Sequence, residues 1–322
     1  MNSRPSRDLA GAGLIVLAAA CFGTLGPLSR FAGDAGVDSL ILVTWRAAIG
    51  AGCMVGFLIA RRSLGLRSGV ALRSLPPREL WFMGAAAVAN TVLNLSVFIA
   101  FERVSIALAL LVFYLYPSLV ALVSVTWFGE RLDRIRWTAL AVSLVGTVLV
   151  VAGAGGLGEL DLPGVALAFV GALGQTFYVL AARHGFSRVP GSQAAALTMG
   201  GAFVVYLAVM VGIGGLAGMA QPLASGAALW PVAVAGVVGA GVPTLAYILG
   251  IRRLGAPRAA ILATLEPVVG VTLAALLLHE QPTLVQALGG VMIIGAGVLL
   301  QLRPRAEAAE HEAVADPPEA MA

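Results

Sequence analysis

The chain has 322 residues, of which 59% are hydrophobic and only 11% are charged, and its mean hydropathy is +0.95. A soluble domain carries about 25% charged residues, so this composition excludes an ordinary soluble protein and favours a chain that crosses a lipid bilayer repeatedly. The net charge is +4, and the basic residues are arginines. Most of these arginines lie at the ends of apolar segments, which argues against a nucleic-acid-binding surface.

Polar residues divide the chain into ten apolar segments, and a helix needs about 20 such residues to cross about 30 Å of hydrocarbon. The expected limits are 9–29, 40–60, 80–101, 104–128, 135–153, 163–182, 193–214, 229–250, 257–278 and 283–301. The run that starts at residue 9 is too long for the apolar core of a cleaved signal, so we interpret it as the first span. The connections are too short for a soluble catalytic domain, and the tail 303–322, rich in Ala, Glu and Pro, is expected to be disordered.

The distribution of arginine predicts how these segments are oriented, because cytoplasmic loops carry an excess of positive charge. With the first residues in the cytoplasm, 17 of the 20 arginines fall on the cytoplasmic side. Arg30 and Arg103 fall in loops on the other side, and Arg46 lies within segment 40–60. We therefore expect an all-α integral membrane protein with ten transmembrane helices and with both termini in the cytoplasm.

The second half of the chain repeats the first. A shift of 150 residues places Pro117 on Pro267 and Glu130 on Glu280, with no gap through the fourth and ninth segments. The expected units are two five-helix repeats, over residues 9–153 and 163–302. Because five is an odd number, the second repeat would be inverted relative to the first, and inverted repeats place a binding site near the bilayer midplane between the halves.

The paired prolines predict bends in the fourth and ninth segments. A proline has no N–H and strains the preceding turn, so the carbonyls of Phe113 and Ala263 lose their helical partners. A freed carbonyl is tolerated in a membrane where it faces a polar cavity or a neighbouring donor. Either Pro117 and Pro267 only kink their helices for packing, or they are hinges on a substrate path. The glycine-rich run that ends at Pro243 is a further candidate hinge.

Four motifs accompany the repeats: LYPSLVAL from residue 115, FGERL from residue 128, LEPVVG from residue 265 and LHEQPT from residue 278. Together with ten spans in two halves, they resemble the EamA branch of the drug/metabolite transporter superfamily, over residues 9–302. The resemblance implies a basket-like bundle in the inner (plasma) membrane, with a central cavity formed by the first, third, fourth, sixth, eighth and ninth segments. It also implies export of small metabolites, with amino acids among the commoner substrates, as in the YddG-like amino-acid exporters.

Two charged side chains lie well inside the apolar segments, where a charge is expensive. Glu266 either lines the cavity, where it would bind a substrate ammonium or transfer a proton, or forms a structural hydrogen bond to a neighbouring helix. Arg46 lies near enough to the outer end of its helix to snorkel, so we interpret it as structural, with contact to a substrate carboxylate as the alternative. The depths of Glu266 and Arg46 differ by roughly 10 Å, which disfavours a direct salt bridge.

Uncharged polar residues supply the other candidate substrate contacts. Asn90 and Asn94 are spaced i, i+4 and share one face of the third segment, so they either line the cavity or hydrogen-bond to a neighbouring helix. Gln175 and Tyr178, at i, i+3, share a face of the sixth segment, with helix packing as the alternative. Four more candidates fall in segments that the resemblance places around the cavity: Tyr114, Tyr116, Tyr247 and Thr264.

Two glutamates follow the fourth and ninth segments at equivalent positions. Glu130 and Glu280 are either solvated charges at helix ends or gating residues. In the second case Glu130 would pair with a loop arginine such as Arg131 or Arg134.

The leading hypothesis for function is a secondary transporter that exports small metabolites, amino acids above all, by alternating access at a midplane cavity. The alternative is a broad-specificity drug/proton antiporter. Small four-span relatives of that kind use a carboxylate in their first helix, and segment 9–29 has none.

An enzyme is not expected, because His184, His279 and His311 are not placed for nucleophilic or metal chemistry inside the bilayer. The sequence has no nucleotide-binding loop and no metal-ligand spacing, so we expect neither a cofactor nor a metal. The expected partners are a small-molecule substrate and the lipid bilayer, not nucleic acid, and we expect the chain to act as a monomer.

Overall fold

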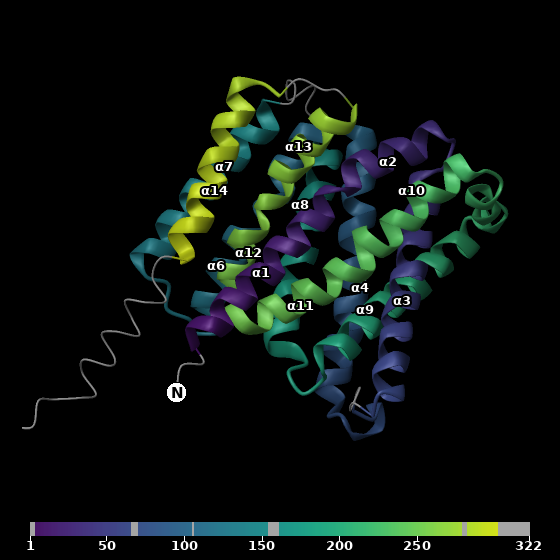
Figure 1. Ribbon diagram of the computed structural model, residues 1–322, viewed down its shortest axis with the longest axis horizontal. Helices are drawn as coiled ribbons and strands as arrows, with labels where there is room; N and C mark the ends of the chain where they lie inside the picture. The colour runs from purple at the N-terminus through teal and green to yellow at the C-terminus, as the bar shows by residue number, and fades with distance from the viewer. Residues whose placement is uncertain (1–3, 66–69, 105, 154–160, 279–281, 302–322) are drawn as a thin grey trace, which may run out of the picture.

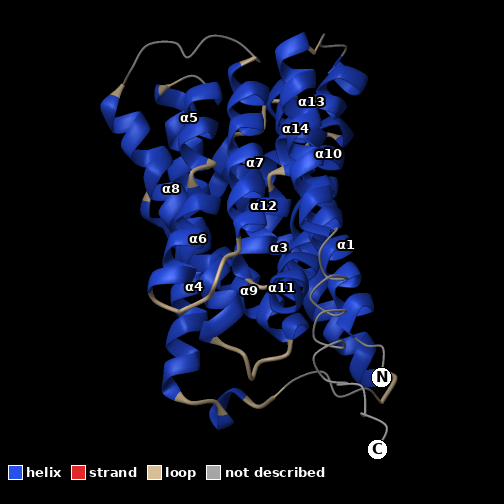
Figure 2. Ribbon diagram, turned by 90° about the vertical axis from the view of Figure 1, so that its left-hand side faces the viewer, coloured by secondary structure: helices blue, strands red, loops and turns tan. Residues whose placement is uncertain are grey.

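The computed structural model describes residues 4–65, 70–104, 106–153, 161–278 and 282–301. Over these residues every regular element is helical, and the helices form an elongated bundle (Figure 2). The tail 303–322 and Glu280, for which the sequence made predictions, lie outside the described residues.

Helices follow one another along the chain with short connections (Figure 1). In the first half they are α1 (Arg4–Gly23), α2 (Leu25–Asp34), α3 (Ser39–Ser63), α4 (Pro77–Arg103), α5 (Ile106–Phe113), α6 (Tyr116–Thr126) and α7 (Arg134–Ala152). In the second half they are α8 (Leu162–Leu180), α9 (Gly191–Gly212), α10 (Gly226–Gly236), α11 (Val242–Leu254), α12 (Ala256–Ala263), α13 (Leu265–Leu278) and α14 (Leu284–Gln301). Four short elements complete the order: the 3-10 helices η1 (Leu72–Ser74) and η3 (Gly215–Leu223), and the π-helices η2 (Ala181–Gly185) and η4 (Val237–Gly241).

The lengths of the apolar helices fit a membrane protein. Among the described residues, nine helical stretches are long and apolar enough to cross a membrane. The tenth expected segment corresponds to α14, a shorter apolar helix whose described apolar part is Leu284–Leu299. Some stretches contain more than one helix, since Leu9–Asp34 takes in α2 and Gly226–Leu254 takes in α10, η4 and α11. Each expected segment is therefore helical, and nine of the ten meet the length of a span.

Three of the spans are interrupted shortly before a proline. The interruptions lie at Thr24, at Tyr114–Leu115 and at Thr264. The bends expected at Pro117 and Pro267 are present, and both prolines are buried, so neither faces lipid. The interruption ahead of Pro27 was not predicted from the sequence. All three follow from the missing N–H of proline, which leaves the preceding turn without its helical hydrogen bond.

Two of these interruptions are closed by a threonine hydroxyl. Thr24 Oγ1 donates to the Cys21 carbonyl at 2.7 Å, and Thr264 Oγ1 donates to the Ile261 carbonyl at 2.6 Å. Each of these carbonyls also accepts the backbone N–H of the same threonine at 3.2 Å, so the second bond gives the threonine hydroxyl a partner in a region without water.

The eighth span changes its helical geometry before Pro243. There η4 occupies Val237–Gly241, within the glycine-rich run that the sequence indicates as a candidate hinge. A π-helix inserts a wider turn into an α-helix and often occurs at functional sites. The glycines also permit close approach, because a Cβ at Gly239 would collide with the side chain of Leu25.

The helices pack in pairs that join the two halves of the chain. α4 lies along α8, α1 along α11, α3 along α9 and α7 along α14. Figure 1 shows α7 and α14 side by side at one edge of the bundle. That contact is close because Gly146 and Gly289 face each other: a Cβ at Gly289 would lie 2.5 Å from the carbonyl oxygen of Gly146. Small residues at a crossing let membrane helices approach and gain dispersion energy.

Two groups of helices form the centre of the bundle. In unit one, α4, α5 and α6 contact α8, and in unit two, α11, α12 and α13 contact α1. The units meet mainly through α6 and α12. Each unit draws helices from both halves of the chain.

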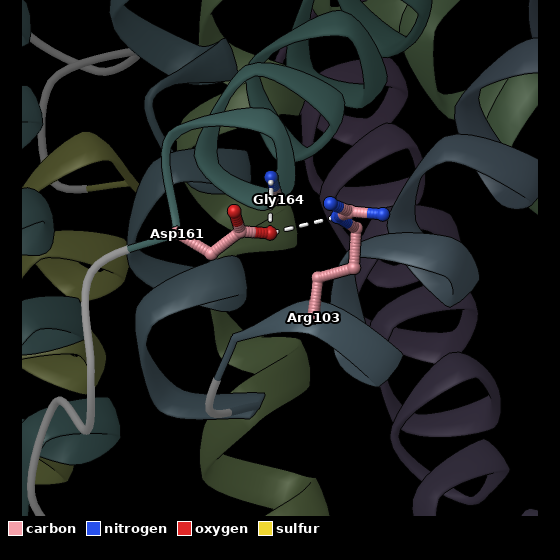
Figure 3. Close-up of polar contacts among 3 residues, drawn as sticks. All are labelled: Arg103, Asp161 and Gly164. Carbon is pink, nitrogen blue, oxygen red and sulfur yellow. Dashed lines mark hydrogen bonds and ion pairs between the residues drawn. The ribbon is translucent and has the colours of Figure 1, made fainter.

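The α4–α8 pair of unit one is tied at the end where α4 finishes. Arg103 Nε lies 2.7 Å from Asp161 Oδ2, and the same oxygen accepts a hydrogen bond from the backbone N–H of Gly164 at 3.2 Å (Figure 3). Asp161 thus caps the first turn of α8 and pairs with α4 at once. The side chains are partly exposed, so the ion pair fixes position more than it stabilises the fold.

Candidate functional site

Polar side chains of α3, α4 and α9 gather inside the bundle. We call Arg46, Asn90, Asn94 and Tyr206 the arginine cluster. Arg46 Nη2 donates to Asn94 Oδ1 at 2.8 Å, and Asn94 Nδ2 donates to the Asn90 carbonyl at 2.7 Å. Arg46 also interacts electrostatically with Tyr206. A guanidinium has five N–H donors, and the described residues accept a hydrogen bond from one of its nitrogens.

A second cluster lies where the interrupted fourth span meets α8 and α11. We call Tyr114, Tyr116, Gln175 and Tyr247 the tyrosine cluster. Tyr116 and Tyr247 are joined by a side-chain hydrogen bond, and Gln175 Nε2 donates to the Tyr247 hydroxyl at 3.3 Å. The rings of Tyr114 and Tyr116 have their centroids 6.2 Å apart. These contacts connect unit one, through α6 and α8, to α11 of unit two.

Glu266 lies within electrostatic range of both clusters. Its carboxyl group interacts with Arg46 of the arginine cluster and with Tyr114, Tyr116 and Tyr247 of the tyrosine cluster. No direct ion pair joins Glu266 to Arg46 in the described structure, as the difference in depth predicted. Glu266 lies in the first turn of α13, where backbone N–H groups left free by the interruption favour negative charge. The break ahead of Pro267 therefore creates an electrostatic niche for this carboxyl group.

Several of these polar residues keep part of their surface accessible. Arg46, Asn94 and Glu266 are partly accessible although they lie mid-span, and so are Asn90 and Gln175. The four tyrosines of the two clusters are buried. Asn90 and Asn94 lie on the side of α4 opposite its exposed apolar face, so their accessible surface does not face lipid. Polar, partly accessible groups enclosed by helices are what a water-filled cavity requires.

Three other candidates have different surroundings. Tyr178 is buried, hydrogen-bonds to Thr198 and interacts electrostatically with Arg252. Thr264 is fully buried, with its hydroxyl bound to Ile261 of its own helix. Pro243 is the second residue of α11, which begins where the π-helix η4 ends. Tyr178 also interacts electrostatically with Tyr247 of the tyrosine cluster.

Glu130 lies beside a histidine rather than beside the loop arginines. Its Oε1 is 3.2 Å from His184 Nε2, in a contact that has the distance of an ion pair but lacks hydrogen-bond geometry. The ring of Phe128 stacks on His184 with centroids 4.0 Å apart. His184 belongs to η2, so the pair holds the loop after α6 against the end of α8.

Arg252 joins the two units at this same end of the bundle. Its guanidinium donates to the backbone carbonyls of Ala182, Phe186 and Val189, which lie in and after η2. In return, Arg183 Nη1 donates to the Arg252 carbonyl. Arg252 is part of α11 in unit two, whereas η2 continues α8 of unit one. These bonds therefore close one end of the interface between the units.

The sequence did not identify Tyr206 or Arg252 as candidates. Tyr206 carries a rare hydroxyl in the middle of the apolar seventh segment, and that signal could have drawn attention to it. Arg252 has no such signal, because it lies at a segment end like most other arginines. Its role depends on the carbonyls of Ala182, Phe186 and Val189, which only the fold brings within reach of its guanidinium.

Comparison with known proteins establishes the family. Residues 9–152 and 162–302 each match the model of the EamA-like transporter family. The chain belongs to this family. Its members are transporters rather than enzymes, and the apolar helices agree with a multi-pass membrane protein.

Two further similarities support this assignment. The EamA-like chain is 27% identical over 214 residues to a protein named "Uncharacterized transporter YxxF" from Bacillus subtilis (strain 168). That match covers 66% of this chain and 66% of the relative, so it spans just under two thirds of the relative's length. A crystal structure of a protein has a TM-score of 0.74 to this chain at 23% identity, and covers 93% of this chain and 99% of that one. At this identity the likeness shows the fold.

Proposed function

We propose that this EamA-like transporter exports small metabolites, specifically amino acids, in the manner of the YddG-like exporters. The observation that supports this is Glu266, an interior carboxyl group that interacts with both the arginine and the tyrosine clusters. An amino acid carries an ammonium and a carboxylate close together. Glu266 suits the ammonium, and the N–H groups of Arg46 that do not bind Asn94 suit the carboxylate.

Uncharged groups would complete the binding site. In this proposal Asn90, Asn94 and Gln175 hydrogen-bond to the substrate, and Tyr114, Tyr116 and Tyr247 form its aromatic wall. Arg46 keeps its structural role as well, because its bond to Asn94 orients the amide. Tyr178 would support these residues through its contacts to α9 and α11, and Thr264 through packing at the interruption before α13.

Transport would proceed by alternating access between two inverted repeats. The helix pairing supports this, because exchanging the halves turns the α1–α11 pair into the α8–α4 pair. The interruptions ahead of Pro117 and Pro267 lie at equivalent positions of the two halves, and Pro243 follows a π-helix. We propose these three prolines as hinges, with Glu130 and Glu280 as gating residues. The arginine distribution supports a plasma-membrane location with cytoplasmic termini, and we propose that the chain acts as a monomer.

Flux through proteoliposomes tests the proposal. The purified chain should move labelled amino acids saturably, and Glu266→Gln should lower the initial rate at least tenfold, because the amide keeps the shape of the side chain but loses its charge. Asp34→Asn is the matched control, since Asp34 is an exposed carboxylate at the end of α2 and should not affect the rate.

Two outcomes would overturn the proposal. If amino-acid flux is unchanged in Glu266→Gln, Glu266 neither binds the substrate ammonium nor transfers a proton during transport. No flux for any amino acid, together with exchange of a lipophilic cation for protons, would instead identify the drug/proton antiporter.

A further inference from the structure

An apolar groove of about 660 Å³ runs along the outside of the α4–α8 pair. Its main lining residues are Trp81, Ala85, Val88 and Val92 of α4 and Leu173 and Phe177 of α8. Trp81, Val88 and Leu173 are among the exposed large hydrophobic residues, so the groove opens to the bilayer and not to the polar interior. Asn90 and Asn94 lie on the other side of α4. The groove is thus separate from the proposed substrate site.

The length of the groove matches a single leaflet. From Trp81 to Val92, α4 rises about 16 Å, which is about half of the ~30 Å hydrocarbon core. Trp81 lies near the start of α4, where a tryptophan marks the membrane interface. An occupant that reaches from the interface to the midplane has the extent of an acyl chain, whereas a helix of a second protein would cross both leaflets.

A positive charge stands at the interfacial end of the groove. Arg78 is exposed, and its guanidinium lies 5.7 Å from the centroid of the Phe82 ring. Phe82 in turn stacks on Phe177, which lines the groove, with centroids 6.2 Å apart. The neighbouring carboxylate, Glu79, is buried and pairs with Arg188 at 3.5 Å. Among the described residues no carboxylate forms an ion pair with Arg78.

We propose that this groove binds one anionic phospholipid, with an acyl chain along α4 and α8 and with the phosphate at Arg78. Basic residues at the membrane surface attract anionic headgroups, and the apolar walls exclude any polar ligand. The lipid would fill the groove between a helix of the first half and a helix of the second. The proposal concerns binding alone and holds whatever the transported substrate is.

Retention of lipid by the purified chain tests this site. Native mass spectrometry would compare phosphatidylglycerol with phosphatidylcholine of the same chain length. A Cβ at Gly84, in the wall of the groove, meets nothing within 4 Å, so Gly84→Leu should fold and fill the groove. Gly13→Leu is the matched control, since Gly13 is an exposed helical glycine of α1 with nothing within 4 Å of its Cβ.

The expected results distinguish binding of the acyl chain from recognition of the lipid headgroup. The unaltered protein and Gly13→Leu should retain one phosphatidylglycerol, Gly84→Leu should retain neither lipid, and Arg78→Gln should lower the preference for phosphatidylglycerol about fivefold. Chain-brominated phosphatidylglycerol should also quench Trp81, measured as the difference from Trp81→Phe. The proposal is wrong if Gly84→Leu retains lipid as before or if Arg78→Gln keeps the full preference. A changed dimer fraction in Gly84→Leu, with lipid retention unaltered, would assign the groove to a second copy of the chain instead.

Discussion

At the scale of single residues, two buried tyrosines differ in whether their hydroxyl has a partner. Tyr206 is 2% exposed and its hydroxyl finds no hydrogen-bond partner among the described residues. Tyr178 is 5% exposed and bonds to Thr198. A buried hydroxyl without a partner costs roughly 1–3 kcal/mol relative to water. The unpaired hydroxyl of Tyr206 therefore lowers the stability of the fold, and it lies in the arginine cluster, which we propose binds the substrate.

Removing each hydroxyl should have opposite effects on stability. Tyr206→Phe should raise the free energy of unfolding by about 1 kcal/mol, because it deletes an unsatisfied polar group, whereas Tyr178→Phe should lower it by about 1 kcal/mol through loss of a bond. Thermal denaturation of the two variants in one detergent compares them directly. A lower melting temperature for Tyr206→Phe would mean that its hydroxyl has a partner, such as cavity water.

At the scale of helices, glycine decides how closely α7 and α14 approach. A Cβ at Gly289 would lie 2.5 Å from the Gly146 carbonyl oxygen and 2.7 Å from the Val150 nitrogen. Both atoms are backbone, so they cannot move aside as a flexible side chain can. Gly295, also in α14, has nothing within 4 Å of the position of a Cβ.

Replacing each of these two glycines with alanine should therefore distinguish the effect of helix packing on stability from the effect of helix propensity. Gly289→Ala should destabilise the fold by about 1–3 kcal/mol, the usual cost of overpacking. Gly295→Ala should be neutral or stabilising by up to about 1 kcal/mol, because alanine is the better helix former. Both are measured by thermal denaturation in detergent, and equal melting temperatures would contradict the close α7–α14 crossing.

At the scale of the whole molecule, the two central units are joined at one end by Arg252. Its guanidinium bonds to the carbonyls of Ala182, Phe186 and Val189 and so holds α11 against η2. Only Ala182 belongs to η2, whereas Phe186 and Val189 follow it, so the guanidinium ties the end of α8 and the segment after it to α11. In the alternating-access cycle that we propose, such contacts would form and break.

Loss of this guanidinium should loosen η2 selectively. Arg252→Gln cannot reach three carbonyls, so amide hydrogen exchange over residues 181–189 should become at least tenfold faster, which corresponds to about 1.4 kcal/mol. The neighbouring Arg253 is exposed, and Arg253→Gln should leave this exchange unaltered. If the amides of residues 181–189 exchanged at the same rate in both variants, Arg252 would not be what holds α11 against η2.

Some features followed from the sequence because they are local. The membrane spans depend on the hydrophobicity of about 20 neighbouring residues, and the bends ahead of Pro117 and Pro267 depend on one missing N–H each. The positions of Arg46 and Glu266 inside the membrane spans were also predicted, because a charged residue within an apolar run is recognised from its sequence neighbours alone. The bend ahead of Pro27 obeys the same rule and could have been predicted in the same way.

Only the tertiary structure decided which of these groups meet. Arg46 bonds to Asn94 and not to Glu266, Gln175 reaches Tyr247 across 72 positions of sequence, and Arg252 closes η2. Such contacts arise from how helices of the two halves pair, and pairing depends on close approach at glycines far apart in the chain. In a bilayer the surface of every helix is apolar, whether it faces lipid or another helix. The hydrophobic pattern alone therefore does not determine which helices pack together.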